Sequence, residues 1–148
     1  MKARTITIKE TILIGKPREV VWDYTQNYDN RTVWDSSVIE TIVLQTEPNR
    51  IVKLNLKGNT TMTFIYKLDD RPHKTTLVAK EIISTFIESA GGSWIYEEQD
   101  GTTKWTQTNT IVFKPSLILK LLLPIFKRIF STQTRRAMKR AKKEIEAK

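Results

Sequence analysis

The sequence predicts an α+β fold, in which a long C-terminal helix lies against a curved antiparallel sheet of seven strands and two short helices follow the first strand. Three features predict this arrangement. Isoleucines alternate with polar residues at the start of the chain, short β-prone runs separated by turn residues fill its middle, and an apolar stripe with helical spacing runs through its end. Because 148 residues is an ordinary length for one domain, we expect a single domain over residues 1–148.

The first strand is predicted from apolar residues at a period of two: Ile6, Ile8, Ile12 and Ile14. Gly15-Lys16-Pro17 ends this strand, and Pro17 suits the first turn of a helix because its fixed φ is already helical. That helix continues to Tyr24, and a second short helix or turn is predicted between Tyr28 and Trp34.

Six further strands are predicted from Val38 onward, because five turn signals divide that region. The signals are Pro48-Asn49, Gly58-Asn59, Asp69-Asp70-Arg71-Pro72, Gly91-Gly92 and Asp100-Gly101. Asp-Gly is a strong signal for a two-residue hairpin turn, since both central residues of a type I′ turn need positive φ. The last signal therefore predicts the register of the strands on either side of it.

This register separates the two faces of the final hairpin. The predicted pairs are Glu97 with Lys104, Tyr96 with Trp105 and Trp94 with Gln107. A charged pair is typical of a solvent-exposed face, so the other face carries a large aromatic and partly polar set: Trp94, Tyr96, Trp105, Gln107, Asn109 and Ile111. By the same alternation, Phe64 and Tyr66 share one face of their strand.

A long helix is predicted after Pro115, with Ser116 as its N-terminal cap. Its apolar stripe has a period of about 3.7 residues, and its members are Leu119, Leu123, Phe126, Phe130, Thr134, Ala137, Ala141 and Ile145. Pro124 should kink this helix or divide it in two, because proline has no N–H to donate within a helix. The apolar segment around Pro124 is too short and too interrupted to span a bilayer.

Residue composition excludes several classes of function. Without cysteine the chain can form no disulfide, thiolate nucleophile or iron–sulfur ligand set, and His73 is the single histidine. We therefore expect no metal centre and no cofactor. The N-terminal residues lack the apolar run of a signal peptide, which predicts a cytoplasmic location.

The net charge of +9 is concentrated at the end of the chain. From Lys120 to Lys148, ten Lys and Arg stand against two Glu, while the rest of the chain is nearly balanced. A basic helical face beside apolar residues suits an anionic membrane surface, and we expect weak association of this kind. Nucleic acid is not an expected partner, because no basic-aromatic motif or nucleic-acid module accompanies the stripe.

Four segments are similar to those of a known superfamily: Pro17-Arg18-Glu19-Val20-Val21-Trp22-Asp23-Tyr24, Trp34-Asp35-Ser36-Ser37-Val38, Asp100-Gly101-Thr102, and the apolar terminal helix interrupted by Pro124. With the order of elements, they resemble the START-like, Bet v 1-like (SRPBCC) superfamily, and within it the polyketide cyclase/dehydrase branch, over the full length. The resemblance implies a helix-grip fold whose cavity, between sheet and terminal helix, accepts lipids, polyketides or similar hydrophobic molecules. It implies no particular reaction, because the superfamily contains carriers, sensors and enzymes.

The candidate ligand-binding residues come from the inward faces of these elements: Phe64, Tyr66, Trp94, Tyr96, Trp105, Gln107, Asn109, Leu119 and Phe126. Such a set suits a filled core as well as a cavity, but the two amides favour a cavity, where water or a polar ligand group can pair with them. The function we predict is the binding of a small hydrophobic molecule by a carrier or sensor. The alternative is a cyclase/dehydratase-type enzyme, with Glu98, Tyr66 or Tyr96 as the weak candidates for a proton donor.

Overall fold

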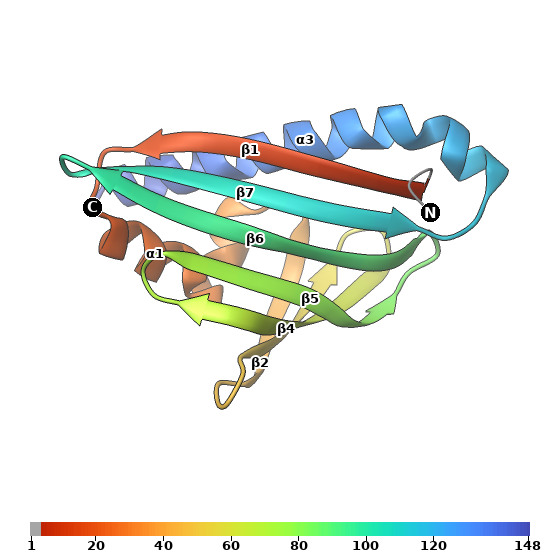
Figure 1. Cartoon of the computed structure of the whole chain (residues 1–148), viewed down its shortest axis with the longest axis horizontal. Coiled ribbons are helices and arrows are strands. Elements are labelled where there is room, and N and C mark those ends of the chain that lie inside the picture. The colour runs from red at the N-terminus through yellow and green to blue at the C-terminus, as the bar shows by residue number, and fades with distance from the viewer. Residues whose placement is uncertain (1–3) are drawn as a thin grey trace.

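The computed structural model of the protein describes residues 4–148 (Figure 1). Strand β1 (Thr5–Ile14) is followed by α1 (Arg18–Gln26), and a second helical segment consists of the 3-10 turn η2 (Tyr28–Asn30) and α2 (Arg31–Trp34). The remaining elements are β2 (Val38–Gln45), β3 (Ile51–Leu56), β4 (Thr60–Asp70), β5 (Lys74–Ile83), β6 (Ile87–Gln99), β7 (Thr102–Phe113) and α3 (Leu117–Glu146). This order confirms the predicted one.

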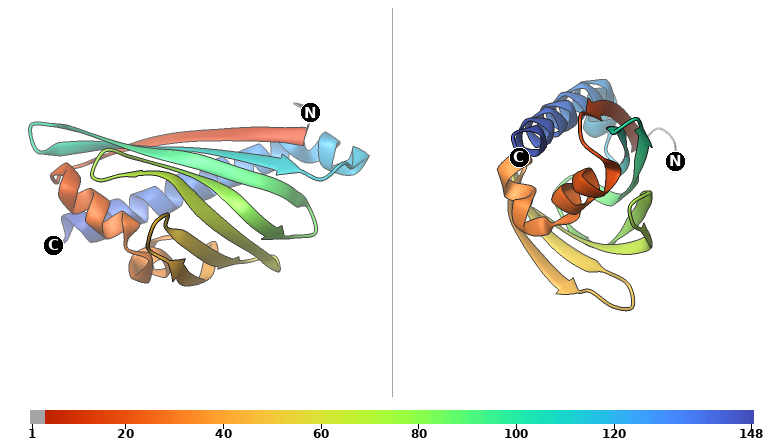
Figure 2. Two further views of the ribbon diagram at one scale, coloured as in Figure 1. Left: turned by 60° about the horizontal axis from the view of Figure 1, so that its bottom comes forward. Right: turned by 90° about the vertical axis from the view of Figure 1, so that its left-hand side faces the viewer.

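The seven strands form one antiparallel sheet in the order β1-β7-β6-β5-β4-β3-β2. The sheet curls strongly, and α3 runs along it beside β1, as both views of Figure 2 show. The helix α1 lies next to the C-terminal end of α3 (Figures 1 and 2). The fold class predicted from the sequence, a curved sheet that grips a long terminal helix, is confirmed.

The last hairpin has the predicted register. Asp100 and Gly101 have φ values of 52° and 79°, as a type I′ turn requires. Tyr96 pairs with Trp105, Trp94 pairs with Gln107, and Glu97 pairs with Lys104. The exposed charged pair and the buried aromatic pair therefore lie on opposite faces of the sheet, as the alternation predicts.

The predicted turn at Gly91-Gly92 is wrong, because both glycines lie inside β6, and the turn between β5 and β6 comprises residues 84–86. The reason for glycine here is the close approach of the neighbouring strand. A Cβ on Gly92 would stand 2.5 Å from Asn109 Oδ1 and 2.7 Å from the backbone oxygen of Thr108. Glycine within a strand often marks such an approach instead of a turn.

Helix α3 begins as predicted and is not divided. The Ser116 hydroxyl accepts a hydrogen bond from the backbone N–H of Leu119, and one helix continues through Pro124 to Glu146. The predicted apolar stripe faces inward: Leu119, Ala137, Ala141 and Ile145 are buried, and Leu123, Phe126, Phe130 and Thr134 are partly buried. The helix therefore contributes one continuous face to the interior of the sheet.

Candidate functional site

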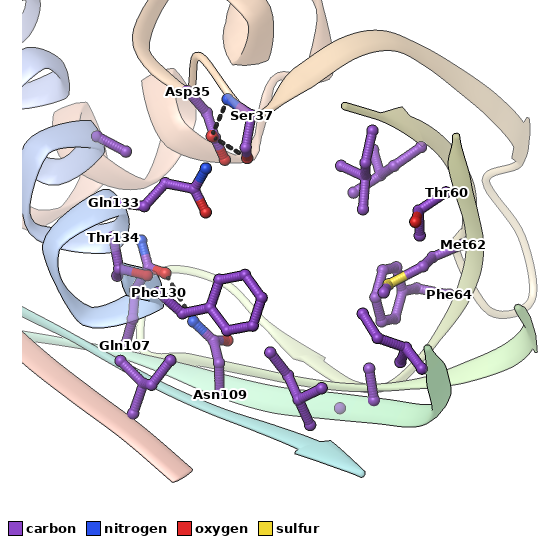
Figure 3. A pocket seen from close by; sticks show the side chains of 18 of the residues that line it. Asp35, Ser37, Thr60, Met62, Phe64, Gln107, Asn109, Phe130, Gln133 and Thr134 are labelled. Carbon is purple, nitrogen blue, oxygen red and sulfur yellow. Dashed lines mark hydrogen bonds between the residues drawn. The ribbon is translucent and has the colours of Figure 1, made fainter. Parts of the chain in front are cut away.

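A cavity of about 370 Å³ lies between the curved sheet, α3 and the segment that contains α2. In Figure 3, Phe130 and Gln133 of α3 face Met62 and Phe64 of β4 across this space, with Asn109 of β7 below. The volume is within the range of small-molecule sites, roughly 300–1,000 Å³. The sheet and the terminal helix thus enclose room for a guest.

Most of the cavity lining is apolar. Its main apolar members are Leu54, Met62, Phe64, Leu77, Ile111, Phe113, Phe126 and Phe130. The rings of Phe113 and Phe126 stack with centroids 5.3 Å apart, so β7 and the first half of α3 hold each other in place. An apolar molecule placed here would exchange water for hydrocarbon and aromatic contacts.

Two amide side chains of β7 lie in the wall of the cavity. Asn109 Nδ2 donates a hydrogen bond to Gln107 Oε1 at 3.1 Å, and Gln107 is only 4% exposed. Among residues 4–148 the side-chain N–H groups of Gln107 have no acceptor. They are therefore available to a polar group in the cavity. A partner there would be favourable, because an unpaired buried amide costs free energy.

A buried ion pair also lies in the wall of the cavity. Arg31 Nε donates to Asp35 Oδ2 at 3.0 Å, and Asp35 Oδ1 accepts from the hydroxyl and the backbone N–H of Ser37 at 2.6 and 3.1 Å. The guanidinium carbon lies 4.9 Å from the ring centroid of Trp34 and 5.2 Å from that of Trp94. All five side chains line the cavity.

Charge on Arg31 is retained despite its burial. Burial alone lowers the pKa of the guanidinium, but the carboxylate of Asp35 raises it more, and nearby Tyr28 raises it further. The resulting pKa lies above the ordinary arginine value. The cavity wall therefore contains a cation and an anion that balance each other.

The structure brings five of the nine predicted ligand-binding residues to the cavity: Phe64, Trp94, Gln107, Asn109 and Phe126. The other four are buried elsewhere. Trp105 is fully buried between Trp94 and Tyr96. Leu119 lies in the first turn of α3 and packs in a cluster with Phe113. Alternation identified the inward face, but that face includes core as well as cavity lining.

The two candidate tyrosines are not part of the cavity lining and belong to a buried hydrogen-bond network that reaches the lining at Tyr28. The hydroxyl of Tyr66 bonds to that of Tyr28 and donates to Gln26 Oε1 at 3.2 Å. The hydroxyl of Tyr96 bonds to Thr25 Oγ1 at 2.7 Å and accepts from Gln26 Nε2 at 2.9 Å. Burial raises the pKa of Tyr66 and of Tyr96 above the ordinary value, which keeps both phenols protonated.

The third candidate proton donor, Glu98, is exposed near the end of β6. Its Oε1 accepts a hydrogen bond of 2.7 Å from the backbone N–H of Arg18, the first residue of α1. A carboxylate at a helix N-terminus pairs with an otherwise unsatisfied N–H, which is a structural role. Glu98, Tyr66 and Tyr96 do not converge on one point in the cavity.

Sequence reasoning did not find Arg31 or Ser37. One feature of the sequence indicates the ion pair: Arg31 and Asp35 are four residues apart, a separation that brings two side chains together on one helix face. The segment between Tyr28 and Trp34 was predicted as a short helix or turn, but nothing in its pattern shows that this face is turned inward. The cation–π contact with Trp94 is not predictable from the sequence, because Trp94 is far from Arg31 in the chain and only the fold brings the two together.

The outer side of α3 carries large apolar side chains. Leu117, Ile118, Leu121, Ile125 and Ile129 are exposed, with Leu121 at 73% and Ile125 at 54%. Leu122 is only partly exposed. Within residues 4–148, no helix has the length and apolar character needed to cross a membrane.

A curled antiparallel sheet around a long terminal helix, with an apolar cavity between them, defines a helix-grip protein of the START-like class. The family model described as polyketide cyclase / dehydrase and lipid transport matches residues 5–146. The chain belongs to this family, whose members bind small hydrophobic molecules. Among curated protein sequences, none matches this chain.

Solved structures share the fold at low sequence identity. The protein TTHA0849 from Thermus thermophilus has a TM-score of 0.83 at 12% identity, over 96% of this chain and 98% of that one. The Zhui aromatase/cyclase from Streptomyces sp. R1128 has a TM-score of 0.79 at 14% identity, over 96% and 94%. A START superfamily protein from Mycobacterium smegmatis has a TM-score of 0.77 at 8% identity, over 95% and 97%.

Proposed function

We propose that this protein is a cytoplasmic carrier or sensor that binds one small hydrophobic molecule, a lipid, a polyketide or a similar compound, in the cavity between the sheet and α3. The observation that carries the proposal is the 370 Å³ space lined mainly by apolar side chains. Membership of a family that includes lipid transport supports it. The few polar groups on the wall would orient the guest and would not dominate its affinity.

A cyclase/dehydratase-type enzyme is the second candidate, and the presence of an aromatase/cyclase among the similar folds is the observation that favours it. An enzyme of this kind needs at least two polar side chains that converge on the reacting atoms. Tyr66 and Tyr96 are not part of the lining, and Gln26 bonds to both of their hydroxyls, while Glu98 bonds to the start of α1. The enzymatic proposal would therefore depend on the amides of β7 or on the pair at Arg31.

The membrane surface is the partner we propose for the outside of α3. Between Lys114 and Lys143 the sequence contains no Asp or Glu, so the exposed apolar residues of α3 are flanked only by cationic charges. Apolar side chains can enter the headgroup region of a bilayer while cations pair with anionic lipids. A carrier of a hydrophobic molecule would collect or release it at such a surface.

The test of ligand binding uses N-phenyl-1-naphthylamine, an uncharged apolar fluorophore. We expect saturable binding at a stoichiometry of one. Ala90 of β6 lines the cavity, and its neighbour Ser89 is exposed. Ala90→Phe should weaken binding by about tenfold, because overfilling a cavity costs about 1–3 kcal/mol and about 1.4 kcal/mol is a factor of ten.

Ser89→Phe adds the same ring to the same strand outside the cavity and is the matched control. It should bind the probe as the unchanged protein does. Absence of saturable binding to the unchanged protein, or equal weakening by the two variants, would contradict the proposed function. Circular dichroism of both variants establishes that each is folded before affinities are compared.

A further inference from the structure

Arg31 has far more hydrogen-bonding capacity than the protein satisfies. A guanidinium has five N–H groups, and only Nε–H of Arg31 has an acceptor, Asp35 Oδ2. Within the described part of the chain, the terminal nitrogens Nη1 and Nη2 have none. The side chain is only 13% exposed and lines the cavity, so bulk water does not readily supply the missing acceptors.

A second unsatisfied donor belongs to the same cluster. The indole Nε1 of Trp34 is buried and has no hydrogen-bond partner among residues 4–148. Trp34 also lines the cavity, and its ring lies against the guanidinium of Arg31. Unpaired buried donors are rare. The Trp34 N–H has no accessible surface, whereas the unpaired Nη groups of Arg31 keep accessible surface in the cavity wall and are the donors that an acceptor in the cavity would meet.

Charge balance restricts what that acceptor is. Asp35 already neutralises Arg31, and the only other charged residue in the lining that residues 4–148 form, Lys57, is exposed at the β3–β4 turn. A ligand carboxylate would leave a net negative charge in a low-dielectric wall, which is costly. A neutral oxygen acceptor adds no charge and still forms a charge-assisted hydrogen bond.

We propose that Arg31 is the polar anchor of the cavity and that it donates a hydrogen bond to a neutral carbonyl oxygen, of a ketone, ester or amide, on an otherwise apolar ligand. This inference rests on the proposed function, because it names the ligand chemistry of the same cavity. Asp35 and Ser37 are positioning residues that hold the guanidinium through Nε. The aromatic rings of Trp34 and Trp94 keep it in place from the side.

The test compares three naphthalenes of nearly the same shape: 2-acetylnaphthalene, 2-ethylnaphthalene and 2-naphthoate. Affinity for the unchanged protein is measured by displacement of N-phenyl-1-naphthylamine. The acetyl compound should bind at least about tenfold more tightly than the ethyl compound, since a hydrogen bond to a charged group is worth that factor or more. Naphthoate should bind more weakly than the acetyl compound.

The variant that removes the anchor is the double substitution Arg31→Met and Asp35→Asn, which leaves no unpaired charge in the wall. It should lose the preference for the acetyl compound and keep its affinity for the ethyl compound. The matched control is Arg71→Met with Asp23→Asn, because Arg71 and Asp23 form an exposed ion pair that is not part of the cavity lining. This control should retain the preference.

The outcomes separate the two proposals. If none of the three naphthalenes binds, the proposed function fails, and the role of Arg31 fails with it. If the acetyl and ethyl compounds bind equally well to the unchanged protein, or if the double variant retains the preference, only the anchor is overturned. If naphthoate binds most tightly of the three compounds, the proposal that the ligand acceptor is neutral is wrong. If the double variant does not fold, the comparison of the three ligands in the unchanged protein still tests the proposed carbonyl acceptor.

Discussion

Three aromatic residues on one face of the last hairpin, Trp94, Tyr96 and Trp105, differ in role. Tyr96 and Trp105 pair across the last hairpin as the Asp-Gly turn predicts, yet both belong to the core. Trp94 is on the same face two residues away, and it lines the cavity. A period of two assigns a side chain to a face, but depth within a curved sheet depends on where α3 and α2 lie.

Trp105 shows the difference between core and cavity lining most clearly. It is fully buried and lies 5.4 Å from Trp94 and 5.6 Å from Trp34, centroid to centroid. Trp105→Ala should lower the free energy of unfolding by about 3–5 kcal/mol, as expected when a large aromatic side chain leaves tight packing. Urea denaturation measures the change.

The matched variant Trp105→Phe retains a ring and removes an indole N–H that has no partner among residues 4–148. It should cost clearly less stability than the alanine variant, because the space it leaves is smaller and an unpaired polar group is removed with the indole. A loss below about 1 kcal/mol for Trp105→Ala would mean that the side chain borders free space.

At the scale of the element, the terminal helix was predicted almost completely. Ser116 caps α3. The stripe from Leu119 to Ile145 faces inward because its spacing matches the turn of an α-helix, about 3.6 residues. The glycines of β6 were misinterpreted, since Gly91-Gly92 indicates a turn by composition. Only the three-dimensional approach of Asn109 shows why a strand needs glycine at position 92.

The exposed side of α3 supports a prediction about membranes. The protein should sediment with phosphatidylserine vesicles at low salt and should be released as salt rises, because basic residues near an anionic surface contribute about 1 kcal/mol each and are screened by ions. Leu121→Gln with Ile125→Gln should reduce binding by removing the apolar side chains that enter the headgroup region.

Ile39→Gln with Leu44→Gln is the control for that experiment. Both residues are exposed large apolar side chains, and they lie in β2 at the far edge of the sheet. This pair of substitutions should leave vesicle binding unchanged. If the unchanged protein does not sediment with phosphatidylserine vesicles even at low salt, the membrane proposal is wrong.

At the scale of the molecule, the cavity and the core are two parts of one interior. The network of Gln26, Tyr66 and Tyr96 ties α1 to β4 and β6, and Arg50 extends it by donating to Gln26 Oε1 at 2.7 Å. Sequence patterns do not predict such a network, because its members are distant in the chain and each has an ordinary local environment. Their hydrogen bonds leave the apolar cavity free of these hydroxyls.

This network predicts how the stability of the whole molecule depends on alkaline pH. Burial raises the pKa of Tyr66 and of Tyr96 in the folded state, whereas a tyrosine in the unfolded chain has a pKa of about 10. Below about pH 10 both states keep these protons and the two groups cause no pH dependence. Above it the unfolded chain loses them first, so the free energy of unfolding should fall by about 1.4 kcal/mol per pH unit for each group.

Tyr96→Phe removes one of these groups and should make that fall shallower by the contribution of one proton. Tyr24→Phe is the control, because Tyr24 of α1 is only partly buried and burial raises the pKa of its hydroxyl less strongly. Urea denaturation from about pH 8 to about pH 11 measures the slopes on both sides of the ordinary tyrosine pKa, and the difference between variant and unchanged protein cancels the titration of lysines. Identical slopes for Tyr96→Phe and the unchanged protein would show that the Tyr96 hydroxyl is not held protonated by the fold.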